Sequence, residues 1–176
     1  MLRGTEREPL PDVSGAALPD STADGAEFSF VANDGEVLLV YFGYTSCPDV
    51  CPTTLLPTSA NALRDLPEEL SERVELAMVT IDPRRDTDEV LTGYVQTFVP
   101  GAHALRTTDD VVLKSAADAL GASYSVVLPP DGGEPEVGHT GFLYAVDSRG
   151  RLVVTWAFGT PADDLSHDLA ILLDDA

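Results

Sequence analysis

The sequence predicts a three-layer α/β fold, in which helices flank a mixed central β-sheet. Two continuous apolar runs, residues 37–42 and 74–81, are typical of strands buried on both faces of a sheet. Each run is followed by a segment with helical periodicity. Residues 142–146 and 152–158 then form a hairpin signal around a turn that contains Gly, and a helical segment closes the chain. Alternation of strand and helix, ending in a hairpin and a helix, favours this fold class.

The first half of the chain begins with 25 residues rich in Pro, Gly, Asp and Ser, which we interpret as an irregular lead-in. The folded domain is then expected to span residues 26–176. Asn33-Asp34-Gly35 is a turn signal, and it separates a short strand from the first buried one. The elements expected here are strands at 28–32 and 36–44, a helix at 53–66 that stops before Pro67, and a strand at 74–81.

The second half of the chain carries clear helix boundaries. Asp86 or Thr87 can cap one helix, with acidic residues in its first turn, and Thr108 or Asp109 can cap another that ends at Gly121. The expected elements are helices at 88–98, 109–120 and 161–173, a short strand at 102–106, an extended segment at 123–128, a loop at 129–138 and the hairpin.

The charge of the chain excludes some functions. There are 30 Asp and Glu residues against 10 Lys and Arg, a formal net charge of −20, and Lys114 is the only lysine. Nucleic-acid binding is not expected, because no basic stripe exists to neutralise phosphates. A lysine-poor acidic surface suits a protein that stays soluble in high salt, so we hypothesise a halophilic source. No run is long and apolar enough to span a bilayer, and two cysteines exclude a disulfide-rich scaffold.

The two cysteines, Cys47 and Cys51, directly follow the first buried strand and are four residues apart. Sites in open α/β sheets form at the carboxyl ends of central strands, and Asp82 follows the next strand in the same way. The amino end of the following helix would stabilise thiolate there. The pair can therefore act as a redox dithiol or hold a soft metal ion such as Cu(I), although a merely structural pair is the simpler alternative. Three residues separate the cysteines, whereas a thioredoxin-type motif has two.

A histidine would supply a third ligand, and the chain has three candidates. His103 lies at a strand edge and His167 in an acidic helix, where structural or solvated roles are expected. His139 lies in Gly138-His139-Thr140-Gly141, just before the hairpin. Sequence alone does not single it out as a ligand.

Four segments resemble the SCO/SenC family. Residues 42–52, Phe-Gly-Tyr-Thr-Ser-Cys-Pro-Asp-Val-Cys-Pro, closely resemble its signature. Residues 80–87, and residues 139–144 together with 147–152, resemble its second and third motifs. Residues 3–5 resemble the segment just after the family's membrane anchor, so the resemblance covers nearly the whole chain.

The resemblance implies a thioredoxin-like fold and copper binding through Cys47, Cys51 and His139. In this fold the loop before the hairpin strand packs beside the cysteine turn, which would bring the imidazole to the sulfurs. Asp49 or Asp82 could add a donor for Cu(II), although a turn role for Asp49 and bonding of Asp82 to Arg85 are the simpler expectations. The resemblance also implies assembly of the dinuclear copper centre of cytochrome c oxidase, on the extracytoplasmic side of a membrane. The tether would be an N-terminal anchor that this chain lacks.

Three functions follow, in order of preference. The first is a copper metallochaperone that delivers copper to the copper-accepting subunit of a terminal oxidase. The second is a thiol–disulfide oxidoreductase, in which Cys47 attacks and Cys51 resolves. The third, a peroxide-consuming enzyme, ranks last, because the sequence has no obvious peroxidatic motif. We expect a monomer with no small-molecule substrate. Arg84, Arg85 and Asp86 are expected to form an ion network on the surface.

Overall fold

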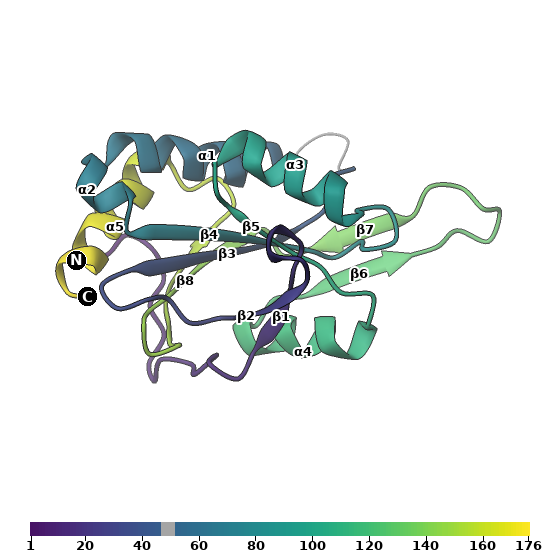
Figure 1. The fold of residues 1–176 in the computed structure, drawn as a ribbon, viewed down its shortest axis with the longest axis horizontal. Helices are drawn as coiled ribbons and strands as arrows, with labels where there is room; N and C mark the ends of the chain where they lie inside the picture. Colours follow the sequence, from purple (N-terminus) through teal and green to yellow (C-terminus); the bar gives the residue numbers. More distant parts are fainter. Residues whose placement is uncertain (47–51) are drawn as a thin grey trace.

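The computed structural model describes residues 1–46 and 52–176, which form a central sheet with helices on both faces (Figure 1). The strands of this sheet are β1 (Ala17–Asp20), β2 (Ala26–Ser29), β3 (Val37–Gly43), β4 (Val74–Thr80), β5 (His103–Leu105), β8 (Phe142–Val146) and β9 (Leu152–Ala157). A two-stranded sheet of β6 (Tyr124–Val127) and β7 (Glu136–His139) projects from one end (Figure 1). The helices are η1 (Ser21–Ala23), α1 (Pro52–Asp65), α2 (Glu68–Ser71), α3 (Asp88–Phe98), α4 (Asp110–Leu120) and α5 (Ala162–Asp174).

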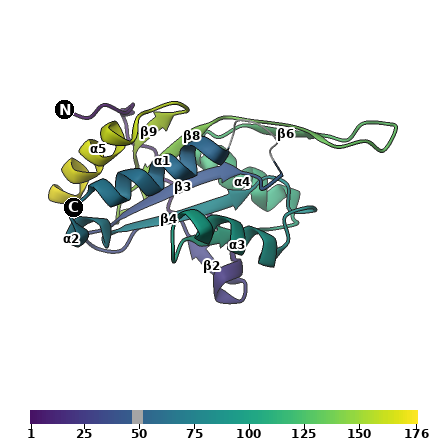
Figure 2. The same ribbon diagram turned by 90° about the horizontal axis from the view of Figure 1, so that it is seen from above.

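The seven strands lie in the order β2-β1-β5-β4-β3-β8-β9. β3, β4 and β5 are parallel to one another, and the remaining pairs are antiparallel, so the sheet is mixed as the sequence predicts. Helices α1, α3 and α5 cover one face and α4 covers the other (Figures 1 and 2). The three-layer arrangement expected from the sequence is thereby confirmed.

β3 is the centre of both halves of the core, because every one of its residues is buried. Alternate side chains point to opposite faces of a strand. Leu38, Val40 and Phe42 accordingly belong to the cluster that packs against α4, and Leu39 and Tyr41 to the cluster beneath α1, α3 and α5. The continuous apolar run in the sequence reflects this burial on both faces.

Most element boundaries match those expected from the sequence, and α3 matches residue for residue. The sequence did not predict α2, η1 or the strand β7. The expectation of an irregular lead-in over residues 1–25 is wrong for its last part, because β1 pairs with β2 and β5 inside the main sheet and η1 follows it. Residues 129–138 were expected to form a loop, whereas β7 begins at Glu136 and pairs with β6. The segment is ordered as a strand by its hydrogen bonds to β6. Its own sequence is polar and contains glycine, so it does not indicate a strand. No helix in the part of the chain that the structure describes is long and apolar enough to cross a membrane.

One buried carboxylate joins the N-terminal segment to both α5 and β9. Asp168, fully buried, accepts hydrogen bonds from the backbone N–H groups of Arg3 and Gly4 and from Nε1 of Trp156. Nδ1 of His167 lies 2.9 Å from Oδ1 of the same residue. Burial by itself raises the pKa of Asp168, but these hydrogen bonds outweigh it and hold the pKa below its ordinary value. Asp168 is therefore a structural anchor at this end of the sheet.

Candidate metal centre

The candidate site lies where β3 and β4 end. The two strands pair in parallel with Gly43 opposite Thr80, so both stop at the same edge of the sheet. Cys47 and Cys51 lie outside the described residues. The structure describes the frame on either side, from Ser46 backwards and from α1 onwards. In the sequence, the predicted pair falls between the end of β3 and the start of α1.

Gly43 makes room for the tyrosine side chain two residues before it. A Cβ atom at position 43 would lie 2.6 Å from Cε1 of Tyr41, which is closer than two carbon atoms can approach. An alanine here would therefore displace the ring of Tyr41. The same ring reaches His139, as described below, so this close approach helps to shape the site.

Asp86 fixes the chain just before the cysteines. Its carboxylate accepts hydrogen bonds from the backbone N–H of Thr45 at 3.0 Å, the hydroxyl of Thr45 at 2.5 Å and the hydroxyl of Thr80 at 2.7 Å. Nε of Arg106 donates to the backbone oxygen of Asp86 at 2.6 Å. Thr45 precedes Cys47 by two residues, so a carboxylate without solvent exposure holds the entry to the cysteine segment.

The predicted surface network of Arg84, Arg85 and Asp86 is wrong. The turn after β4 folds back, with the N–H groups of Arg85 and Asp86 donating to the backbone oxygen of Asp82. This turn directs the carboxylate of Asp86 inward, while Arg84 is exposed. Arg85 instead forms an ion pair with Asp82, which is the structural role expected for that aspartate. Asp49, the other carboxylate considered for Cu(II), lies outside the described residues.

His139 is the predicted ligand that the structure describes. It is the last residue of β7, paired across the ribbon with Tyr124. Its ring meets those of Tyr41 and Tyr44 edge-on, with ring centroids 6.3 Å and 5.9 Å apart. Tyr44 lies at the end of β3, three residues before Cys47. The topology therefore brings His139 to the strand end from which the cysteine segment starts.

The two nitrogens of His139 have different surroundings. Nδ1 lies 3.3 Å from the backbone oxygen of Thr140, and a carbonyl can only accept, so we assign the proton of the neutral ring to Nδ1. Nε2 then carries the lone pair, is buried, and has no hydrogen-bond partner among the described residues. Burial lowers the pKa of His139, and the hydrogen bond to Thr140 opposes this only in part. A neutral imidazole with a buried, unpartnered nitrogen suits a metal ligand.

The other two histidines are engaged elsewhere. Nδ1 of His103 lies 2.7 Å from Oδ2 of buried Asp20, and its ring packs on that of Phe28 at a centroid distance of 4.4 Å. His167 is paired with Asp168 in α5. Both histidines are partly exposed, and each is next to a carboxylate. Only His139, of the three, contacts the tyrosines at the end of β3.

Residues 1–46 and 52–176 hold no group of three or more His, Cys, Asp or Glu side chains that could bind a metal by themselves. A metal bound by His139 at this edge would therefore need ligands from outside these residues. Sequence reasoning did not find Asp86, Tyr41 or Tyr44 as parts of the site. The one signal in the sequence was the presence of Thr45 and Thr80 at the ends of two adjacent expected strands, because two neighbouring hydroxyls can share one hydrogen-bond acceptor.

Comparison with known proteins gives a consistent result. The profile of the SCO1/SenC family matches residues 21–174. A SCO2-like protein of Rickettsia prowazekii is 32% identical over 146 residues, which cover 75% of this chain and 68% of the relative.

Solved structures give the same picture. Apo Sco1 of Thermus thermophilus superposes with a TM-score of 0.83 at 32% identity, covering 98% of this chain and 97% of that one. Copper-bound ScoI of Bradyrhizobium japonicum superposes with a TM-score of 0.72 at 26% identity, covering 89% and 96%. The expected thioredoxin-like α/β class is confirmed by these neighbours.

Proposed function

Because this chain belongs to the SCO1/SenC family, we propose that it is a copper metallochaperone that binds Cu(I) or Cu(II) through Cys47, Cys51 and His139. The observation that carries this proposal is Nε2 of His139, which is buried and unpartnered among the described residues and lies beside Tyr44. Copper bound to a related ScoI structure supports the choice of metal.

The donor set suits the metal. Cu(I) prefers soft thiolates and is satisfied by few ligands, whereas imidazole serves both oxidation states. Two sulfurs and Nε2 would hold copper at the end of β3, and thiolates of an acceptor could displace the donor's ligands one at a time. Asp86 would act at a distance, by fixing Thr45 in front of Cys47.

We further propose that the acceptor is the copper-accepting subunit of a terminal oxidase, and that the role is assembly of the dinuclear copper centre of cytochrome c oxidase. The protein would work as a monomer on the extracytoplasmic side of the membrane. Family membership supports this assignment.

A competitive Cu(I) titration of the reduced protein tests the ligand set. His139→Ala should weaken Cu(I) binding by more than about tenfold, or about 1.4 kcal/mol, because a ligand is lost. His167→Ala is the matched control, since that histidine lies in α5, and it should bind Cu(I) like the parent. Equal affinities of parent and His139→Ala would show that His139 is not a ligand.

Thiol–disulfide exchange remains a second candidate, favoured by the start of α1 at Pro52, directly after Cys51. A helix amino end stabilises thiolate. In this reaction the two thiols give two electrons and two protons to a disulfide of the acceptor, and Cys47 and Cys51 become joined as a disulfide. The rate of exchange with a model disulfide discriminates the two functions. A reductase should keep its rate in His139→Ala, whereas a chaperone should lose copper affinity in the same variant.

A further inference from the structure

The ribbon that carries His139 has an open edge. β6 pairs with β7 and with no other strand among the described residues. Thr140 donates its N–H to the oxygen of Ser123 at 2.9 Å, so these opposite residues form a hydrogen-bonded pair. Such pairs alternate along an antiparallel ladder. Tyr124 and Val126 therefore direct their backbone N–H and C=O groups away from β7, on the side where β6 has no partner strand among the described residues, and no hydrogen bond described outside the strand ladders involves these groups.

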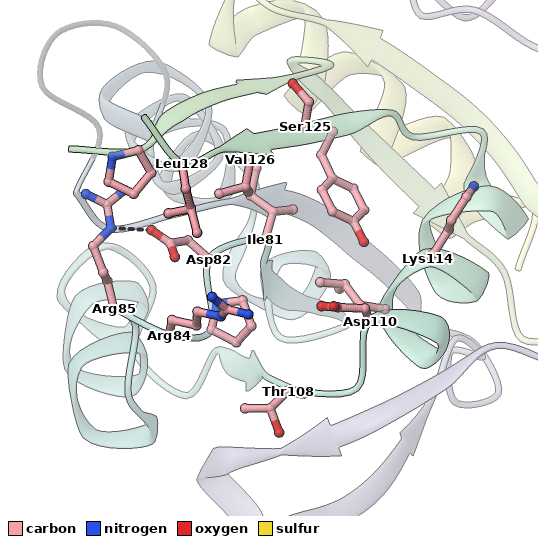
Figure 3. Close-up of a pocket in the computed structure, with 14 residues that line it drawn as sticks. Ile81, Asp82, Arg84, Arg85, Thr108, Asp110, Lys114, Ser125, Val126 and Leu128 are labelled. Carbon is pink, nitrogen blue, oxygen red and sulfur yellow. Dashed lines mark hydrogen bonds and ion pairs between the residues drawn. The ribbon is translucent and has the colours of Figure 1, made fainter. Parts of the chain in front are cut away.

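A groove runs along this edge. It has a volume of about 510 Å³ and lies between β6, the turn after β4 and the first turns of α4. Its apolar lining includes Ile81, Leu113, Val126 and Leu128. In Figure 3, Val126 and Leu128 point from the ribbon into the same space that Arg84 enters from the turn. Val126 and Leu128 are 38% and 59% exposed, an unusual amount for apolar side chains that line a groove.

The groove also carries one basic side chain, Arg84, that has no ion-pair partner among the described residues, and one carboxylate, Asp110, that has none either. Two of its three basic side chains are paired, Arg85 with Asp82 and Lys114 with Asp118. The exposed guanidinium of Arg84 has no ion pair within the described part of the chain. Several other arginines of the described residues have no ion pair either, but Arg84 is the one of them that lines the groove. It complements a carboxylate of an incoming molecule.

We propose that the outer edge of β6 is a docking strand for the copper acceptor, which adds an extended segment to the ribbon. The segment pairs with the backbone of Tyr124 and Val126, places apolar side chains at alternate positions against Val126 and Leu128, and gives a carboxylate to Arg84. That the partner is the acceptor rests on the proposed function, whereas the docking strand itself does not.

The register explains why docking here would help transfer. Tyr124 lies opposite His139 in the ribbon. Neighbouring strands are about 4.8 Å apart, so a segment added outside β6 runs about 10 Å from the strand that carries His139. A second copy of this chain is a poorer occupant, because two chains of charge −20 repel each other. Added-strand pairing would hold the acceptor beside the metal ligand without covering it.

The test uses a defined probe and the whole protein. The probe is a short synthetic peptide of alternating Val and Thr with one central Glu, N-methylated at alternate residues so that it pairs through one edge only. At saturating peptide, amide hydrogen exchange at Tyr124 and Val126 should slow by more than about tenfold, since both amides gain a partner. Unchanged exchange at these two amides would overturn the proposal. A peptide methylated at every residue is the negative control.

Two pairs of variants separate backbone pairing from charge recognition. Val126→Pro removes the outward N–H and should abolish peptide binding, whereas Val126→Ala keeps the N–H and should retain most of it. Arg84→Glu should weaken binding by about tenfold or more and should favour a peptide with Lys in place of Glu. Arg149→Glu makes the same change of charge in the β8–β9 turn, at the opposite end of the sheet, and should have no effect. Equal binding by Arg84→Glu and Arg149→Glu would refute the charge contact.

Copper binding keeps this proposal distinct from the proposed function. Arg84→Glu and Val126→Pro should bind Cu(I) like the parent, which also shows that the ribbon is intact, and His139→Ala should still bind the peptide. Loss of copper binding in Val126→Pro would mean that this substitution has unfolded the ribbon. In that case, peptide binding by Arg84→Glu and hydrogen exchange at Tyr124 and Val126 in the parent decide whether the docking strand exists. A dimer in the absence of peptide that protects the same two amides would overturn the proposal in favour of a second copy.

Discussion

Replacing Asp86 with alanine should destabilise the protein strongly, because its carboxylate has three donors and no exposure to solvent. Thr80 is also fully buried, so its hydroxyl would be left without an acceptor, at about 1–3 kcal/mol. Thr45 is partly exposed, so its N–H and hydroxyl can form hydrogen bonds with water instead, and their loss adds about 1 kcal/mol to the destabilisation. The free energy of unfolding should fall by about 2–4 kcal/mol in total.

Urea unfolding of the reduced protein, followed by the fluorescence of Trp156, measures this loss. That tryptophan is the only one in the chain and is buried, so its signal reports the folded state. Asp174→Ala is the control, since Asp174 is exposed at the end of α5 and should change stability by less than about 0.5 kcal/mol. A loss below about 1 kcal/mol in Asp86→Ala would refute the reasoning. The milder Asp86→Asn should remain folded and bind Cu(I) about tenfold more weakly, as positioning residues of metal sites do.

Three further predictions concern the rest of the domain. Stability should rise with salt, because screening weakens the repulsion within a chain of charge −20; a urea midpoint that is unchanged between dilute and molar NaCl would count against a halophilic origin. Burial raises the pKa of Asp168, but hydrogen bonds, including those with His167 and Trp156, hold it below 3.8. The stability that Asp168 contributes should therefore be complete above pH 3.8 and disappear as the pH falls through the lower, folded-state pKa. The difference in urea midpoint between the parent and Asp168→Asn should shrink over that range, and a difference that stays constant would contradict the prediction. Gly43→Ala should cost about 1–3 kcal/mol, because the added Cβ displaces the ring of Tyr41; the same urea assay checks it, and a neutral result would show that the ring can move freely.

The central layers of this fold were predictable because their signals are local. The apolar runs of β3 and β4 and the capped helix α3 follow from periodicity and end residues alone. β7 was not predictable, since Glu136–His139 holds a glycine and few apolar residues, and its partner strand is what orders it. Strand pairing depends on long-range contacts, which a single sequence does not show.

The same division holds at the candidate site. Local spacing indicated a dithiol at the end of a strand, and the resemblance to a family, not the residue itself, singled out His139. The edge-on contacts of His139 with Tyr41 and Tyr44 join segments almost 100 residues apart, and no local pattern encodes them. The inward carboxylate of Asp86 depends on the turn that follows β4, whose charged sequence suggested the surface instead.

X-ray absorption at the copper edge of the reduced, Cu(I)-loaded protein tests the central claim most directly, because it counts the donor atoms around the metal. We predict two sulfurs and one imidazole nitrogen for the parent, with the scattering of the imidazole ring lost in His139→Ala and kept in His167→Ala. A parent spectrum with sulfur donors alone, or an imidazole signal that survives in His139→Ala, would contradict the assignment of His139 as the third copper ligand.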